Sequence, residues 1–159
     1  MRKTTLSFLI KKNQILLAMK KRGFGKGKWN GVGGKVQRGE KIEDATIRET
    51  IEEIGVTPHN LKQVATLDFY YADKFEGKTF DQRVHVFLVS EWSGELIETK
   101  EMLPRWFKKN NLPFHLMWKD DIYWLPAILS GKLLNGKFIF NKKEEVVEYH
   151  LEIGSYKTI

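Results

Sequence analysis

The sequence contains no cysteine, which excludes a disulfide framework, cysteine-bound zinc, iron–sulfur clusters and a cysteine nucleophile. It also has no apolar run that approaches the roughly 18 residues of a membrane-spanning helix. The apolar stretch at residues 4–10 is too short and too mixed for a signal peptide. We therefore expect a soluble, cytoplasmic protein that has no membrane partner.

Acidic residues are missing from the first quarter of the chain. Residues 1–39 hold 11 of the 27 Lys and Arg residues and no Asp or Glu, although the whole chain contains 20 acidic residues. A basic region beside an acidic remainder suits a polyanionic ligand that is bound together with a cation. A solvated basic face is the alternative interpretation.

The composition is that of a globular domain. The 159 residues are the length of one ordinary domain, 42% of them are hydrophobic, and 10 Phe, 5 Trp and 5 Tyr can supply a core. We predict a single domain over residues 1–159, without repeats or linkers. Hydrophobic patterning indicates an α+β fold with a mixed sheet. The strands are predicted at 5–10, 14–19, 63–71, 84–91, 105–108, 138–140 and 146–153, and the helices at 42–54 and 122–130.

Glycine is concentrated between residues 22 and 34, where six of 13 residues are Gly. Such density lets the backbone approach a ligand closely, although a flexible linker would share it. The basic residues in this segment, together with Phe24 and Trp29, favour a ligand-binding loop.

Three glutamates share one side of the first predicted helix. Glu49, Glu52 and Glu53 are spaced i, i+3 and i+4, so their carboxylates project together and repel one another. A hard divalent cation such as Mg²⁺ resolves the repulsion, because it prefers oxygen ligands and usually shares them with substrate phosphates. A solvated acidic face is the alternative that these three residues alone leave open.

Isoleucines occupy the other side of the same helix. Ile47, Ile51 and Ile54 fall at i, i+4 and i+7 and form an apolar stripe. We expect this stripe to face the core, and a self-association surface is the alternative.

The spacing around the triad is specific. The pattern Gly-x5-Glu-x7-Arg-Glu-U-x-Glu-Glu-x-Gly-U, in which U is aliphatic, spans residues 34–56 and matches at eight of nine positions. It resembles the Nudix box, the metal-binding loop–helix–loop of Nudix hydrolases. Thr50 is the exception, and we expect its effect on local packing rather than on metal binding. The resemblance implies an α/β/α sandwich with a central mixed β-sheet. The matching residues are Gly34, Glu40, Arg48, Glu49, Glu52, Glu53, Gly55 and Val56.

The resemblance extends along nearly the whole chain. Segments 20–25, 29–31, 33–36, 84–87, 101–102, 117–118, 120–121 and 123–124 are similar to the eukaryotic-type MutT homologues within the family. This implies Mg²⁺-dependent hydrolysis of oxidised purine nucleoside triphosphates, such as 8-oxo-dGTP and 2-hydroxy-dATP, to the monophosphate and pyrophosphate. Mn²⁺ is the expected substitute cation. We expect a monomer that takes a small-molecule nucleotide and has no stable nucleic-acid partner.

The family's catalytic roles can be carried over residue by residue. Glu53 is assigned to orient or deprotonate the attacking water, with Glu52 beside it. Arg48 is expected to orient the glutamates, and Glu40 to tie the loop to the helix. The implied metal ligands are the Gly33 carbonyl, Glu49, Glu52, Glu53 and, from a separate loop, Glu101.

The implied substrate pocket combines stacking with hydrogen bonding. Trp118 offers a face for a purine, although an ordinary core tryptophan is the alternative. Asp120 and Asp121 either cap the second helix or form a desolvated pair in which one carboxyl donates and the other accepts. Asn30 adds a donor and an acceptor. Lys119 replaces a family proline, which makes the loop less rigid. The full implied set is Thr5, Lys20, Phe24, Asn30, Val32, Gly33, Gly34, Lys35, Phe69, Trp118, Lys119, Asp120, Asp121 and Trp124.

Two other functions remain open on the sequence. A Nudix hydrolase of ADP-ribose, a dinucleoside polyphosphate or an undamaged nucleoside triphosphate would carry the same box. A non-catalytic module that binds nucleic acid through residues 1–39 would show a steep salt dependence and would not need the glutamates. The complete triad weighs against the second alternative.

Overall fold

The computed structural model describes residues 1–72, 74–75 and 78–154. The helices are α1 (Ile42–Ile54) and α2 (Asp121–Leu129), with a 3-10 turn at Phe114–Leu116. The single domain predicted over residues 1–159 includes positions 73, 76–77 and 155–159, which lie outside the described residues. The strands are β1 (Arg2–Lys11), β2 (Gln14–Lys20), β3 (Trp29–Asn30), β4 (Thr57–Pro58), β5 (Lys62–Tyr71), β6 (Lys74–Phe75), β7 (Lys78–Thr79), β8 (Gln82–Val89), β9 (Trp92–Ser93), β10 (Met102–Lys108), β11 (Leu134–Phe140) and β12 (Val146–Ile153).

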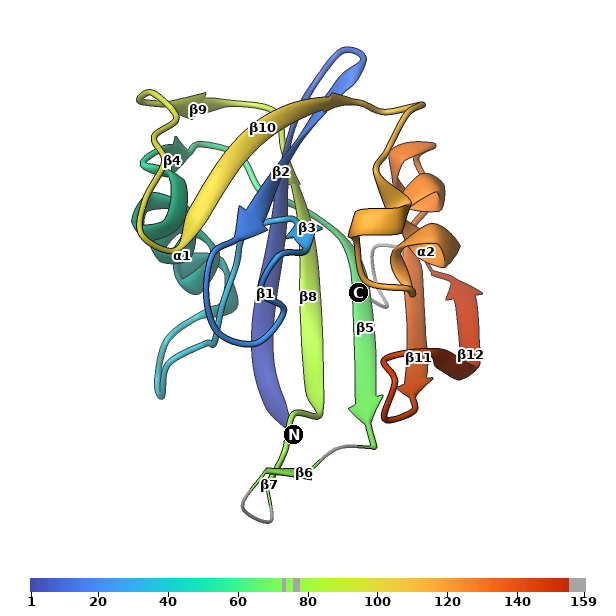
Figure 1. Ribbon diagram of the computed structural model, residues 1–159. Helices are drawn as coiled ribbons and strands as arrows, with labels where there is room; N and C mark the ends of the chain where they lie inside the picture. Colours follow the sequence, from blue (N-terminus) through green and yellow to red (C-terminus); the bar gives the residue numbers. More distant parts are fainter. Residues whose placement is uncertain (73, 76–77, 155–159) are drawn as a thin grey trace.

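A mixed sheet of eight strands forms the centre of the molecule (Figure 1). Its strands run in the order β10-β2-β1-β8-β5-β11-β12, and β3 pairs with β2. β1 pairs with β8 in parallel, and so does β5 with β11, while the other neighbours are antiparallel. The predicted α+β class with a central mixed sheet is confirmed.

The two helices cover opposite faces of this sheet. Side chains alternate along a strand, so neighbouring residues of β1 enter different cores. Leu9 packs in one core with Ile54 of α1. Phe8 packs in the other with Trp124 of α2, and their ring centroids are 6.1 Å apart. Burial of both faces produces the predicted α/β/α sandwich.

Helix α1 has the predicted bounds, and it ends at Gly55, whose φ of 79° gives the left-handed cap. The isoleucine stripe, however, is only partly buried, because Ile54 is fully buried but Ile51 is 44% exposed. Thr50 is fully buried instead, and its Oγ1 lies 3.2 Å from Ser7 Oγ of β1. The expectation of a core stripe is therefore wrong at Ile51, because α1 meets a polar position of the sheet.

The strand bounds differ from the predictions where pairing extends a strand beyond its apolar residues. β8 begins at Gln82 rather than at residue 84, because Gln82 still pairs with Arg2 of β1. β10 begins at Met102 rather than at residue 105, because Met102 pairs with Lys20 of β2. No helix within the described ranges is long and apolar enough to cross a membrane.

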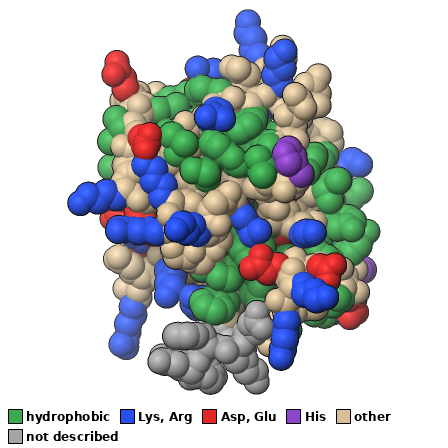
Figure 2. All heavy atoms as spheres, in the orientation of Figure 1, with side chains coloured by type: hydrophobic (Ala, Val, Ile, Leu, Met, Phe, Trp, Pro, Cys, Tyr) green, Lys and Arg blue, Asp and Glu red, His purple; other side chains and the backbone are tan. Residues whose placement is uncertain are grey.

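Basic side chains are spread over one face of the molecule rather than gathered in one continuous patch (Figure 2). Apolar side chains and backbone separate them in this view. Four basic residues of the acid-free first quarter, however, line one pocket: Arg2, Lys20, Lys28 and Lys35.

Candidate active site

Arg48 of α1 is the centre of an ion-pair network. Its Nε donates to Glu40 Oε2 at 2.8 Å, and its Nη2 donates to Glu40 Oε1 at 2.9 Å. These hydrogen bonds lower the pKa of Glu40 to about 2. Nη2 also donates to the Lys35 carbonyl at 3.0 Å, and Nη1 donates to Glu49 Oε1 at 2.8 Å. Arg48 and Glu40 therefore join the loop before α1 to the helix.

Glu53 is a buried carboxyl beside Glu49, which belongs to this network. It is 6% exposed, and its Oε1 accepts a hydrogen bond from the Gly33 backbone N–H at 3.0 Å. Burial, and after it the neighbouring Glu49 carboxylate, raise the pKa of Glu53 to about 8. The loop leaves no space beside these groups, because a Cβ at Gly34 would lie 2.5 Å from Glu49 Cδ.

The other two predicted acidic ligands, Glu52 and Glu101, have exposed rather than buried side chains. Glu52 is 58% exposed and lies 3.4 Å from Arg48 Nη1. Glu101 precedes β10 and accepts a hydrogen bond from Arg22 Nε at 2.7 Å, which lowers the pKa of Glu101. Over the described ranges, no three Asp, Glu or His side chains are grouped closely enough to hold a metal ion.

The donors nevertheless suit a hard cation. Glu49 and Glu53 are two carboxylates held close enough to raise a pKa by mutual repulsion, and such a pair is stabilised by positive charge between its oxygens. Glu52 and Glu101 add two further carboxylates that are open to solvent. Oxygen donors alone are present, which favours a cation of the Mg²⁺ type.

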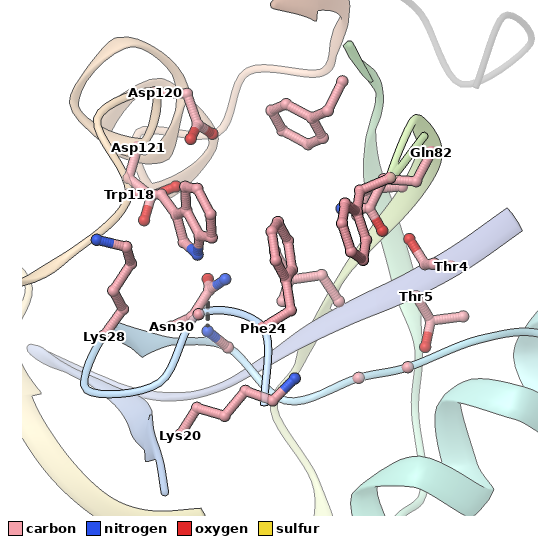
Figure 3. Close-up of a pocket in the computed structure, with 18 of the residues that line it drawn as sticks. Thr4, Thr5, Lys20, Phe24, Lys28, Asn30, Gln82, Trp118, Asp120 and Asp121 are labelled. Atoms are coloured by element: carbon pink, nitrogen blue, oxygen red, sulfur yellow. Dashed lines mark hydrogen bonds between the residues drawn. The ribbon is translucent and has the colours of Figure 1, made fainter. Parts of the chain in front are cut away.

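A cavity of about 420 Å³ adjoins the glutamates on the α2 side of the sheet (Figure 3). It extends from the backbone of Gly33 and Gly34 to the start of α2. Twelve of the fourteen predicted substrate residues line it: Thr5, Lys20, Phe24, Asn30, Gly33, Gly34, Lys35, Phe69, Trp118, Asp120, Asp121 and Trp124.

Two predicted substrate residues do not line the cavity. Val32 is 2% exposed and packs with Leu9 and Ile54 in the core beneath α1, because its bridge to Ser7 turns the side chain to that face. Lys119 is exposed beside Trp118, and its side chain is directed to solvent.

Aromatic rings enclose the middle of the cavity. Phe24 stacks on Phe80 with the centroids 4.7 Å apart, and it lies 5.1 Å from the Trp118 ring. Tyr71 meets Trp118 edge-on at 6.0 Å. Gly25 has a φ of 84° and would bring a Cβ to within 3.4 Å of Trp118 Nε1, so glycine is needed there. A flat base can stack against this surface.

Asp120 and Asp121 are buried at the end of the cavity, 3% and 2% exposed. Asp120 Oδ2 accepts a hydrogen bond from Trp124 Nε1 at 2.7 Å, and Asp121 Oδ2 has no partner within the described ranges. Burial raises the pKa of Asp120 to about 6, and burial together with Asp120 raises that of Asp121. No side-chain hydrogen bond caps α2, so the capping alternative is wrong.

Asn30 and Lys28 complete this end of the cavity. Asn30 Oδ1 accepts from the Gly31 N–H at 2.8 Å, which leaves the two amide N–H donors of Asn30 for a ligand. Lys28 Nζ lies 5.0 Å from the Trp118 ring centroid and counteracts the raised pKa of Asp121.

Sequence reasoning missed several residues of the cavity. Tyr71 and Gln82 belong to strands whose alternate residues line the cavity, and this alternation was the signal that could have identified them. Thr4 lines the cavity together with its neighbour Thr5, so alternation would not have identified it. Phe80 and Lys28 come from connecting segments, where no periodicity applies.

A mixed sheet between two helices, with a glutamate-rich helix and a glycine-rich loop beside a nucleotide-sized cavity, is the architecture of Nudix-type hydrolases. The NUDIX domain model matches residues 1–128, and the chain belongs to the Nudix hydrolase family. The box at residues 34–56 predicted this membership, and the prediction is confirmed.

Relatives and solved structures agree with this assignment. The chain is 44% identical over 148 residues to the oxidized purine nucleoside triphosphate hydrolase of Danio rerio, which covers 93% of this chain and 92% of the relative. It is 40% identical over 153 residues to the protein of that name from Mus musculus, with 96% of each chain covered. A MutT protein structure from Bacillus halodurans superposes with a TM-score of 0.82 at 28% identity, over 96% of this chain and 98% of that one.

Proposed function

We propose that this protein hydrolyses oxidised purine nucleoside triphosphates to the monophosphate and pyrophosphate, and so removes damaged precursors from the nucleotide pool. The observation that carries the proposal is the buried pair Asp120 and Asp121 beside Trp118, at one end of a cavity whose other end adjoins Glu53. The relatives' names support the same substrate class.

The phosphates belong at the glutamate end. Nudix hydrolases generally use divalent cations, and here Mg²⁺, or Mn²⁺ in its place, would be held by the Gly33 carbonyl, Glu49, Glu52, Glu53 and Glu101. When bound, the cation neutralises phosphate charge and activates the attacking water. Lys20 and Lys35 line the same region and provide further positive charge for the triphosphate.

Glu53 is the group that we assign to the attacking water. The Gly33 N–H holds one of its carboxyl oxygens at 3.0 Å, so the orientation of the carboxyl is fixed. Burial raises its proton affinity, and a carboxylate with raised affinity is a better acceptor of a proton from water. Arg48 positions the neighbouring Glu49 and does not line the cavity.

The base belongs between Trp118 and the aspartate pair. Desolvation raises the pKa of both carboxyls, which favours a pair with one proton, so that one carboxyl donates while the other accepts. Together with the Asn30 amide donors they can pair with the polar edge of a purine. Redistribution of that proton allows the same pair to bind bases with different donor and acceptor patterns, including 8-oxoguanine and 2-hydroxyadenine.

A substrate panel tests the proposal. We expect kcat/KM with Mg²⁺ to be highest for 8-oxo-dGTP or 2-hydroxy-dATP, lower for dGTP, and lowest for ADP-ribose. Glu53→Gln protein, checked by circular dichroism, controls for contaminating phosphatases. Equal or better turnover of ADP-ribose would refute the substrate class while leaving the family assignment intact.

We also propose that the protein acts as a cytoplasmic monomer without a stable nucleic-acid partner. The face drawn in Figure 2 supports the last point for that face alone, because its basic side chains are spread out and binding of a nucleic-acid backbone favours a continuous basic surface. Sedimentation at micromolar concentration, with and without single-stranded RNA, tests both the monomer and the absence of binding.

A further inference from the structure

One polar group interrupts the aromatic surface of the cavity. Gln82, the first residue of β8, lines the cavity, and its Nε2 donates to the Tyr71 hydroxyl at 3.4 Å. This hydrogen bond uses one of the two amide N–H groups. Within the described ranges, Oε1 and the second N–H of Gln82 have no protein partner, so both remain for a ligand.

Arg2 adds a cation at the same position. The register of β1 and β8 places Arg2 directly beside Gln82, and the two residues line the cavity together. The guanidinium lies over the Phe80 ring at 5.3 Å, and no carboxylate pairs with it in the described part of the chain. Its Nε is buried and has no hydrogen-bond partner among the described residues. A buried donor of this kind is stabilised when a ligand offers an acceptor.

This polar group lies across the cavity from the aspartates. Figure 3 shows Gln82 on the side of Thr4 and Thr5, with Asp120 and Asp121 on the other side. Tyr71 connects the two regions, because its hydroxyl accepts from Gln82 while its ring meets the Trp118 ring. A base held at one edge by the aspartates therefore presents its opposite edge toward Gln82.

We propose that the Gln82 amide, fixed by Tyr71 and assisted by Arg2, recognises the oxidised imidazole edge of an 8-oxopurine. This rests on the proposed function. An 8-oxopurine carries N7–H and a C8 carbonyl side by side, and an amide is complementary to both, with Oε1 accepting from N7–H and Nε2 donating to O8. An unmodified purine has an acceptor at N7 and only C–H at C8, so it forms neither of these hydrogen bonds and can accept at most one, at N7 from Nε2.

The substitution Gln82→Met tests the inference, because it keeps the length of the side chain and removes the amide. We expect kcat/KM for 8-oxo-dGTP to fall about tenfold or more. 2-Hydroxy-dATP is the internal comparison, because its oxidised group is on the other edge and its imidazole edge is unmodified. Its kcat/KM should stay within about threefold of wild type. Gln63→Met, a matched substitution on β5 outside the cavity, should leave both substrates unchanged.

Binding of the product monophosphates gives a measurement that does not depend on turnover. Calorimetry without added cation should show that wild type prefers 8-oxo-dGMP to dGMP, and that Gln82→Met and Tyr71→Phe reduce this preference. An equal loss for 8-oxo and 2-hydroxy substrates, or an unchanged 8-oxo-dGMP preference, would overturn the inference. Absence of turnover of every oxidised purine triphosphate by wild type would instead refute the proposed function, and the binding comparison would still judge Gln82.

Discussion

The aspartate pair should make the ligand-free protein less stable as the pH rises. Asp120 and Asp121 have raised pKa values in the folded protein because they are buried. Above a pH of about 4 an unfolded chain releases both protons, while the folded protein still binds them. The folded state then holds more protons, so the free energy of unfolding decreases with increasing pH until the raised native pKa is passed.

The size of the effect follows from the shift. For Asp120 a rise from 3.8 to about 6 corresponds to about 3 kcal/mol at neutral pH, at about 1.4 kcal/mol per pKa unit. Asp121→Asn removes one carboxyl and the repulsion between the two. We expect the variant to be more stable than wild type by about 1–3 kcal/mol at pH 7, and by less at pH 5.

Urea denaturation of the ligand-free protein at pH 5, 6 and 7 measures this difference. Asp44→Asn, at an exposed carboxylate in the first turn of α1, controls for the change of net charge. Curves of stability against pH that superimpose for Asp121→Asn and wild type would refute the reasoning. So would a variant that is less stable than wild type at pH 7.

Four further substitutions test the site and the loop that supports it. Glu53→Gln should keep the fold and lower kcat at least about a hundredfold at saturating Mg²⁺, and near-native turnover would show that another group serves the water. Asp120→Asn should lower kcat/KM for 8-oxo-dGTP about tenfold to a hundredfold more than for dGTP. Glu52→Gln should lower kcat/KM for the two substrates by a similar factor. If Asp120→Asn also lowered kcat/KM equally for 8-oxo-dGTP and dGTP, Asp120 would have no part in base recognition. Gly33→Ala would place Cβ 1.8 Å from the Thr5 carbonyl oxygen, so thermal melts should show a loss of roughly 3 kcal/mol or more.

The sequence predicted the parts of the fold that depend on local patterning. Helix α1 and its end at Gly55 follow from periodicity and a glycine cap, and both have the predicted bounds. The burial pattern of the helix was not predictable in the same way. Ile51 is exposed while Thr50 is buried, because the sheet presents the Ser7 hydroxyl to α1, and no pattern within the helix contains that information.

The candidate site likewise contains residues that the sequence predicted and residues that it did not. The Nudix box identified Arg48, Glu49 and Glu53 because their spacing on one helix is fixed, and the structure brings them together. Gln82 and Tyr71 escaped notice because they come from two strands that only the sheet register places side by side. Strand alternation could have nominated each of them separately, but no pattern in a single sequence shows that their two strands are neighbours.

The parallel pairing of β1 with β8 has a consequence for how the chain folds. The first strand is central in the sheet, and Thr5 finds its neighbour at His85, far along the chain. Closing so long a loop costs entropy before any pairing energy is gained, and such non-local contacts slow folding. One edge of β1 pairs with β2 in a hairpin, but the other edge stays unpaired until β8 has left the ribosome. We therefore expect the sheet that forms the cavity to fold in one late, cooperative step during synthesis, and not gradually from the amino terminus.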